Sequence, residues 1–237
     1  MIKDLLKSNA RRYPDKTAIV FEDTRYTYKE FNDRVNRLAN GLVNLGFKKG
    51  DWIAIVADDC IQQVEVFWAG AKAGIATSSL NPNSSKRDFL HLIGNGKARA
   101  VVCSQKHLNL VKSLRPELEG VKEFIVIGPA EKGFTGYEDL TSNSSSLEPN
   151  VEISEDDLLY FGNTSGTTGL SKQPMHTHNS LFSEALMDLD ALNYDMSAGG
   201  AFLVAVPLFA AIVLPRVSIL SFYMRCPLVI PSDLAPQ

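Results

Sequence analysis

Apolar residues recur every three or four positions in the stretch that follows Thr27, with polar residues between them. This spacing places the apolar residues on one face of a helix, so it predicts an amphipathic helix from about residue 28 to residue 45. Thr27 and Glu30 have the spacing of a capping box at the start of this helix. The predicted buried stripe consists of Phe31, Val35, Leu38, Leu42 and Leu45.

Short apolar runs alternate with further helix-like stretches along the first half of the chain. The runs at 52–57, 99–104 and 124–128 are rich in Val, Ile and Ala, as expected for strands that are buried on both faces. Because the connections between strands and helices are short, the alternation predicts an α/β fold with mostly parallel sheets and helices on both faces. Further helices are predicted at 3–13, through 64–71 and at 87–93 and 108–114, and further strands at 17–21, 25–28 and 75–81.

A polar stretch at residues 141–152 interrupts this alternation. It has no apolar spacing of the kind that a helix or strand needs, so we interpret it as a linker. The linker divides the chain into an amino-terminal α/β subdomain, 1–140, and a second α/β segment, 153–237. In the second segment the pattern predicts a strand at 158–162, an extended segment at 174–178 and a helix at about 180–192.

The sequence becomes strongly apolar between residues 201 and 230. The run at 201–215 carries no charge, but prolines and Arg216 interrupt it before it reaches the roughly 18 residues that a membrane-spanning helix needs. We therefore expect a buried strand, helix and strand here, and no membrane span. Apolar surface that this segment leaves uncovered would favour self-association.

The charge balance argues against a nucleic acid as partner, because 24 basic and 27 acidic residues give a net charge of −3. Cys60, Cys103 and Cys226 are far apart and lie in apolar runs. This placement is typical of reduced thiols in a cytoplasmic protein, so we assign neither disulfides nor metal ligands. Charged residues throughout the first fifteen positions argue against a secretory signal.

The stretch from Asn163 to Lys172 departs from these burial patterns. It reads Asn-Thr-Ser-Gly-Thr-Thr-Gly-Leu-Ser-Lys and follows directly on the apolar run at 158–161. Glycine lets the backbone approach a ligand, so that N–H groups can point inward together with the hydroxyl groups, and the lysine adds positive charge. A polyphosphate fits such a loop, although the spacing is not that of a Walker A loop. The alternative interpretation is a polar surface turn.

The order of residues in this loop resembles the phosphate-binding signature of the adenylate-forming superfamily, which includes acyl-CoA synthetases, luciferases and peptide-synthetase adenylation domains. Ser165 to Gly169 is followed by Lys172 and then by the pair Thr177 and His178, as in that signature. The segments 46–55 and 69–82 also resemble the amino-terminal part of acyl-CoA synthetases. The resemblance spans most of the chain and implies the α/β fold of that part of the family.

The resemblance implies an ATP-dependent, AMP-forming acid–CoA ligase. In this reaction the carboxylate of a small-molecule acid attacks the α-phosphate of ATP to give an acyl-adenylate and pyrophosphate, and the thiol of CoA then takes the acyl group. The implied cofactors are therefore ATP, Mg²⁺ and CoA. Lys172 and Thr167 are implied as catalytic residues, because they would stabilise the charge of the departing pyrophosphate. The residues implied in binding ATP are Thr164, Ser165, Gly166, Thr167, Thr168, Gly169, Lys172 and His178.

Some positions depart from the family pattern. Ser171 stands where proline is usual, and Gln173 and Pro174 stand where glycine and an aliphatic residue are usual. Because Pro174 has no backbone N–H, we expect it at a sheet edge or a bulge. Ala210 stands where the family has a histidine that is associated with the acyl pocket.

The resemblance does not extend to the family's later segments, which hold adenine, magnesium and the ribose and supply an adenylation lysine. The sequence therefore leaves three functions open. The first is the amino-terminal part of an acid–CoA ligase, and the second is a module that binds a nucleotide or polyphosphate without turnover. The third is ester or thioester hydrolysis through Ser165 or His178, which lacks the Gly-x-Ser-x-Gly motif.

Overall fold

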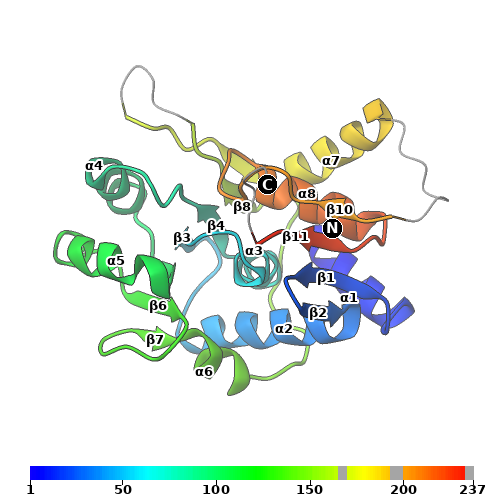
Figure 1. The fold of residues 1–237 in the computed structure, drawn as a ribbon, viewed down its shortest axis with the longest axis horizontal. Helices are drawn as coiled ribbons and strands as arrows, with labels where there is room; N and C mark the ends of the chain where they lie inside the picture. The colour runs from blue at the N-terminus through cyan, green and yellow to red at the C-terminus, as the bar shows by residue number, and fades with distance from the viewer. Residues whose placement is uncertain (165–169, 193–199, 233–237) are drawn as a thin grey trace.

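The computed structural model describes residues 1–164, 170–192 and 200–232, which form two β-sheets and the helices that cover them (Figure 1). The helices are α1 (Ile2–Arg12), α2 (Tyr28–Asn44), α3 (Ile61–Ala73), α4 (Lys86–Phe89), α5 (Leu108–Leu114), α6 (Tyr137–Ser142), α7 (His178–Leu192) and α8 (Val213–Tyr223). The strands are β1 (Thr17–Phe21), β2 (Thr24–Thr27), β3 (Trp52–Val56), β4 (Ala76–Ser79), β5 (Ala100–Ser104), β6 (Glu123–Ile127), β7 (Thr135–Gly136), β8 (Leu158–Phe161), β9 (Met175–Thr177), β10 (Phe202–Leu203) and β11 (Leu228–Ile230).

The larger sheet has the strand order β7-β6-β5-β3-β4-β8-β9. Its strands are parallel from β7 to β8, and β9 runs antiparallel to β8 at the edge. Along β3, Ile53 and Ile55 join the core that includes α2 and α3. Their neighbours Ala54 and Val56 join the core on the opposite face, with residues of α4 and α5. Side chains alternate between the faces of a strand, so a strand that is apolar throughout needs helices on both.

The smaller sheet joins segments from the two ends of the described chain. Its order is β10-β11-β1-β2, and β11 is parallel to both of its neighbours. Phe222 of α8 completes the packing below this sheet, because its ring lies 5.6 Å from the rings of Tyr28 and Phe31 and 5.0 Å from that of Trp68. Helices α1, α2, α3 and α8 therefore share one core.

The α/β fold predicted from the sequence is confirmed. The helix predicted at 28–45 is α2, and the predicted capping box is present, since the N–H of Glu30 donates to Thr27 Oγ1 at 3.2 Å and the N–H of Thr27 donates to Glu30 Oε2 at 2.8 Å. The sequence did not predict β7, α6 or the π-helical turn at Leu90–Asn95 that continues α4. Pro174 directly precedes the edge strand β9, as its missing N–H requires.

The apolar tail forms β10, α8 and β11, in the predicted order of strand, helix and strand. Its large apolar side chains are buried or partly buried, except those of Leu203 and Val206, which are exposed. Across residues 1–164, 170–192 and 200–232, every helix is too short or too polar to cross a membrane.

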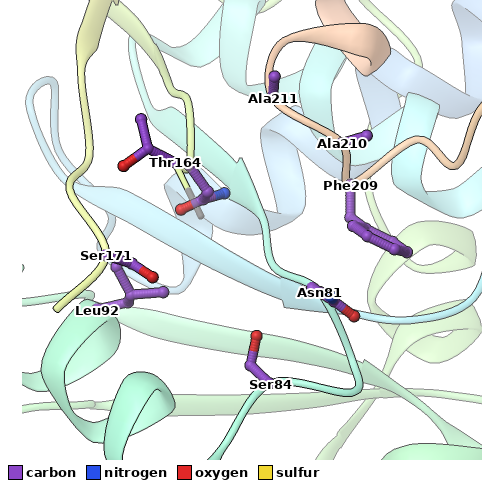
Figure 2. A pocket seen from close by; sticks show the side chains of 9 residues that line it. Asn81, Ser84, Leu92, Thr164, Ser171, Phe209, Ala210 and Ala211 are labelled. Carbon is purple, nitrogen blue, oxygen red and sulfur yellow. The ribbon is translucent and has the colours of Figure 1, made fainter. Parts of the chain in front are cut away.

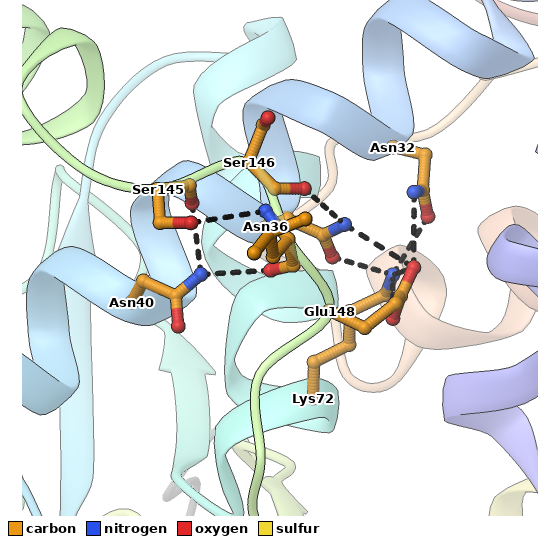
Figure 3. A network of polar contacts seen from close by, with 8 residues as sticks. Asn32, Asn36, Asn40, Lys72, Ser145, Ser146 and Glu148 are labelled. Carbon is orange, nitrogen blue, oxygen red and sulfur yellow. Dashed lines mark hydrogen bonds and ion pairs between the residues drawn. The ribbon is translucent and has the colours of Figure 1, made fainter.

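Residues 143–152 form neither helix nor strand, yet side chains of α2 hold them in place (Figure 3). Asn36 and Asn40 are four residues apart and so lie on the same face of the helix. The side-chain amide of Asn40 donates to the carbonyl groups of Ser145 and Leu147, at 2.8 Å each, and that of Asn36 donates to a third carbonyl of the segment at 2.9 Å. We call residues 143–152 the strap.

A buried ammonium group lies beneath the strap. Nζ of Lys72, on α3, donates to Oδ1 of Asn32 at 2.6 Å and to Oδ1 of Asn36 at 2.7 Å. Glu148 of the strap supplies the counter-charge, with Oε2 at 2.9 Å from Nζ. Burial lowers the pKa of Lys72, and the charge of Glu148 opposes this shift. Glu148 therefore ties the strap to both α2 and α3 (Figure 3).

The predicted linker, 141–152, thus comprises the end of α6 and the whole strap. The strands on either side of it belong to one sheet, because β8 pairs with β4 in parallel at Tyr160 and Thr77. The division of the chain into two domains at 141–152 stays a prediction.

The hairpin of β8 and β9 has the predicted phosphate loop at one end and His178 at the other. His178 follows β9 directly, and its N–H donates to the carbonyl of Asp157, just before β8, at 3.2 Å. The side chain is 2% exposed, and no described residue forms a hydrogen bond with either ring nitrogen. Desolvation lowers the pKa of His178 to about 4, although the Asp157 carboxylate opposes this shift. The imidazole is therefore neutral at pH 7.

Replacement of Glu148 by alanine should destabilise the protein, because the buried Lys72 ammonium would lose its counter-charge. We expect the free energy of unfolding to fall by about 2–3 kcal/mol. Breaking a fully buried ion pair costs about 3–5 kcal/mol, and the loss is smaller here because Glu148 is partly exposed to solvent. Urea denaturation followed by circular dichroism measures this loss. The double variant Lys72→Met, Glu148→Gln should recover most of it, and a loss no larger than that of the exposed Glu119→Ala would contradict the role of the strap.

His178 should make the protein less stable in weak acid. Its pKa is about 4 in the folded protein and about 6.5 in the unfolded chain, so only the unfolded state takes up this proton between those values. Stability is therefore lost as the pH falls from about 6.5 toward 4, by about 2 kcal/mol at pH 5 for this residue. Urea denaturation at pH 7.5 and pH 5 should show a smaller difference for His178→Gln than for the wild type. Equal differences would refute the burial of a neutral imidazole.

Candidate functional site

The carboxyl ends of β4 and β8 lie side by side at one edge of the larger sheet, because these strands are parallel and paired. Ligands of open α/β sheets bind outside the carboxyl ends of the strands. The chain that leaves β8 enters the predicted phosphate loop at this edge, and the chain that leaves β4 carries Asn81 and Ser84. Topology therefore brings two polar segments together there.

The two ends of the phosphate loop are joined by hydrogen bonds. The N–H of Thr164 donates to the carbonyl of Lys172 at 3.1 Å, and the N–H of Lys172 donates to Thr164 Oγ1, also at 3.1 Å. One step further out, the N–H of Gly162 donates to the carbonyl of Pro174 at 3.0 Å. The hairpin of β8 and β9 thus continues as a neck up to Thr164 and Lys172.

The predicted site residues are divided by this neck. Thr164 and Lys172 face each other across it, and both side chains are exposed. The predicted residues between them, Ser165, Gly166, Thr167, Thr168 and Gly169, lie outside the described residues. His178 is at the far end of the hairpin, beside Asp157, so the structure does not bring it to the neck.

A cleft of about 340 Å³ opens beside the neck (Figure 2). Thr164 and Ser171 lie on one side of it, and Phe209 and Ala210, from the chain before α8, lie on the other. Ala210 contributes only a methyl group where the resemblance implies a histidine. The complete described lining is Asn81, Ser84, Leu92, Asn163, Thr164, Ser171, Phe209, Ala210 and Ala211. The cleft is therefore polar near the neck and apolar opposite it.

Asn163 fixes the start of the loop to the end of β4. Its side-chain amide donates to the carbonyl of Ser79 at 2.8 Å and to Ser78 Oγ at 3.1 Å. The Ser78 hydroxyl in turn donates to the carbonyl of Phe161 at 2.9 Å. Because β4 and β8 share so few paired residues, these side-chain bonds help to hold the loop at the sheet edge.

Ser79, at the carboxyl end of β4, is hydrogen-bonded to two buried side chains, those of Tyr160 and Gln63. The N–H of Ser79 donates to the hydroxyl of Tyr160 at 3.3 Å, and the Ser79 hydroxyl donates to the side chain of Gln63. Burial raises the pKa of Tyr160, so its hydroxyl stays protonated at neutral pH. These groups are paired with one another and are fully buried, which suits support rather than contact with a ligand.

Phe209 also lines a second cleft, of about 330 Å³, at the carboxyl ends of β3 and β5. Asp58 lies there with Lys106 Nζ at 3.0 Å and His107 Nε2 at 3.3 Å. Partial burial raises the pKa of Asp58, but Lys106 and His107 outweigh this effect and lower it. Phe209 thus separates the cleft at the neck from a charged cleft.

The wall that contains Phe209 is anchored by a carboxylate. Asp59 Oδ1 accepts the N–H of Leu208 at 2.9 Å, and burial raises the pKa of Asp59 although this bond opposes the shift. Ala211 has a φ of 45°, a left-handed conformation that costs a residue with a side chain roughly 1–2 kcal/mol. The segment that forms this wall of the cleft is therefore a strained turn, and the hydrogen bond to Asp59 holds it in place.

Most of the residues that line the two clefts were not predicted from the sequence as site residues. Asn81, Asn163 and Asp58 had a usable signal, because each is polar and closely follows a buried strand. Phe209 had none, since its approach depends on how the chain around α8 packs against distant strands.

The family model of AMP-binding enzymes matches residues 6–235 of this chain. Acyl-CoA ligase sidI of Aspergillus fumigatus is 28% identical over 209 residues, which cover 80% of this chain and 35% of that protein. 4-Hydroxybutyrate–CoA ligase 2 of Metallosphaera sedula is 25% identical over 217 residues, which cover 87% of this chain and 39% of that protein. The chain thus spans less than two fifths of the length of these relatives.

Two solved structures superpose on this fold. The inhibitor-bound N-terminal domain of FACL13 from Mycobacterium tuberculosis has a TM-score of 0.86 and 26% identity, and the match covers 99% of this chain and 57% of that one. ATP-bound MatB from Rhodopseudomonas palustris has a TM-score of 0.79 and 23% identity, with 97% of this chain and 45% of that one covered. With a family match that extends over nearly all of its residues, the chain belongs to the AMP-binding enzyme family.

Proposed function

We propose that this chain is the nucleotide-binding, amino-terminal part of an ATP-dependent, AMP-forming acid–CoA ligase. The observation that carries this proposal is the neck at Thr164 and Lys172, which lies beside a partly polar cleft at the carboxyl edge of the sheet. The names of the relatives support the same activity, since they are acyl-CoA ligases. The match covers 35–39% of those two relatives, and the proposed turnover is that of a ligase of their kind.

The described residues around the loop fit a polyphosphate. The ammonium group of Lys172 is exposed and forms no ion pair within the described part of the chain, so its charge is available to a ligand. Hydroxyl and amide groups of Thr164, Ser171 and Asn163 line the adjoining cleft. The proposed nucleotide-binding residues are Thr164, Ser165, Gly166, Thr167, Thr168, Gly169 and Lys172, of which Thr167 and Lys172 are the proposed catalytic residues. We leave out His178, because it is buried at the far end of the hairpin.

In the proposed first step, the carboxylate of a small-molecule acid forms a bond to the α-phosphorus of ATP. The bond from that phosphorus to the β-phosphate oxygen breaks, and pyrophosphate leaves with additional negative charge. Lys172 and the hydroxyl and N–H groups of the loop would stabilise this charge more strongly in the transition state than in bound ATP, which is how such groups accelerate a reaction. In the second step the sulfur of CoA forms a bond to the acyl carbon, the bond from that carbon to the phosphate oxygen of AMP breaks, and the thiol proton is released to solvent.

Mg²⁺ would accompany the phosphate groups of ATP and supply further positive charge. The described lining of the cleft offers hydroxyl and amide oxygens but no carboxylate. Such a lining suits a hydrated Mg²⁺ that is held chiefly through phosphate oxygens.

A nucleotide-binding module without turnover is the second candidate. One observation favours it: Ala210 supplies no titratable group to the cleft. Hydrolysis of esters through Ser165 and His178 is less well supported. The imidazole is buried beside Asp157, while the loop that contains Ser165 begins at the opposite end of β8.

Replacement of Lys172 by alanine should weaken the binding of Mg-ATP, because a charge-assisted contact with phosphate is lost. We expect the dissociation constant to rise about tenfold or more, which corresponds to about 1.4 kcal/mol or more. Isothermal titration calorimetry of the wild type, Lys172→Ala and the exposed control Lys122→Ala measures this change. Equal affinities of all three proteins for Mg-ATP would show that Lys172 does not contact the nucleotide and would contradict the proposed site.

Exchange of labelled pyrophosphate into ATP separates the two candidates. Exchange that depends on an added carboxylic acid and is lost in Lys172→Ala supports the ligase. Binding of Mg-ATP without exchange across a panel of acids supports the module without turnover.

We also propose that the chain self-associates through the apolar segment 201–230. The structure leaves few large apolar side chains of this segment exposed, so the proposal rests on β10, which is an edge strand with Leu203 61% exposed. An exposed apolar edge strand presents unpaired backbone groups that a second strand can bond.

Sedimentation velocity should therefore show a mass that increases with protein concentration. Leu203→Lys should shift the protein toward monomer, because a charge on an edge strand opposes pairing. Leu147→Lys is the control, since Leu147 is 77% exposed and lies on the strap. A wild-type mass that stays monomeric at all concentrations would exclude this association.

A further inference from the structure

A third cleft, of about 170 Å³, lies where α1 packs against the end of α8. It is separate from the cleft at the neck, which adjoins the chain before the start of α8. Its lining consists of Leu5, Ser8, Asn9, Arg12, Phe222, Tyr223 and Arg225. The side-chain amide of Asn9 donates to the carbonyl of Phe222 at 2.7 Å and so fixes the two helices to each other across the cleft.

The guanidinium groups of Arg12 and Arg225 line this cleft. Neither Arg12 nor Arg225 forms an ion pair with any of the residues described. The guanidinium of Arg225 lies 5.7 Å from the centre of the Tyr13 ring, a contact that orients the side chain but leaves its charge uncompensated. The site therefore has two positive charges and the hydroxyl groups of Ser8 and Tyr223.

Arg225 occupies a backbone position that favours glycine. It follows the last turn of α8 with a φ of 58°, and the N–H of Cys226 donates to the carbonyl of Ser221 at 2.9 Å. This is the geometry of a helix that ends in a left-handed residue, for which glycine is usual because it has no Cβ. The chain thus accepts backbone strain at the residue whose side chain lines the cleft.

We propose that this cleft binds a phosphate group. Two guanidinium groups match the double negative charge of a phosphate monoester or inorganic phosphate, and their forked N–H groups can bond its oxygens in pairs. A volume of about 170 Å³ is smaller than the roughly 300–1,000 Å³ of pockets that enclose whole organic ligands. The cleft therefore takes the phosphate group alone, and any larger ligand extends into solvent. Because the bound group would contact both α1 and α8, it would stabilise the folded chain.

Thermal unfolding with inorganic phosphate tests this site. At constant ionic strength and pH 7.5, phosphate at about ten times its dissociation constant should raise the Tm by about 3–6 °C relative to chloride. The rise should be lost in Arg12→Gln and retained in Arg11→Gln, which changes the neighbouring exposed arginine outside the cleft. A parallel series with AMP in place of phosphate shows whether a phosphate monoester is accepted as well as the free ion.

Arg225→Gly separates loss of the ligand from loss of the fold. Glycine relieves the left-handed backbone, so we expect this variant to have a Tm in chloride at least as high as that of the wild type, yet no response to phosphate. Lys172→Ala should retain the full response, which keeps this site distinct from the phosphate loop. The proposal is overturned if phosphate leaves the wild-type Tm unchanged, if Arg12→Gln and Arg225→Gly respond like the wild type, or if Lys172→Ala abolishes the response.

Discussion

A buried ammonium group cannot be left without a counter-charge, and this constraint shapes the middle of the chain. Helix α3 is buried along almost its whole length, and Lys72 is the charged residue near its end. The partners of Lys72 come from α2 and from Glu148, so the strap has to cross α2 before the chain can continue. That crossing places β8 beside β4 in the larger sheet, between β4 and the edge strand β9. A polar segment without helix or strand therefore decides where the phosphate loop begins.

Much of the fold could be predicted from the sequence because its signals are local. The stripe of α2 and the apolar runs of β3, β5 and β6 follow from spacing alone, and the capping box at Thr27 and Glu30 is confirmed. The strap was harder to predict. Its backbone groups are bonded to asparagines spaced by four residues on α2, and such long-range polar contacts leave no periodic pattern in the strap itself. The sequence shows that those asparagines are four residues apart, but this spacing alone does not indicate that they bind the strap.

In the candidate site, too, the features that depend on neighbouring residues in the sequence could be predicted, and those that depend on contacts between distant segments could not. The order of residues from Asn163 to Lys172 predicted a loop that suits phosphate, and the neck now gives that loop a defined frame at Thr164 and Lys172. The opposite wall of the cleft was not predictable, because Phe209 and Ala211 reach it only through the packing of α8 and the anchor at Asp59. His178 illustrates the limit of a motif: it follows the loop closely in sequence, but an antiparallel strand carries it to the other end of the hairpin.

The smaller sheet has a consequence for how the chain folds during synthesis. Strand β1 is made early, yet its neighbour β11 pairs with it through Leu228, and the ring that covers Tyr28 and Phe31 belongs to Phe222. At about 5–20 residues per second, a ribosome needs roughly ten seconds or more to add the residues between them. During that interval the aromatic face of α2 has no cover and β1 has a free edge. In the nascent chain these apolar surfaces therefore stay exposed to solvent until β11 emerges from the ribosome.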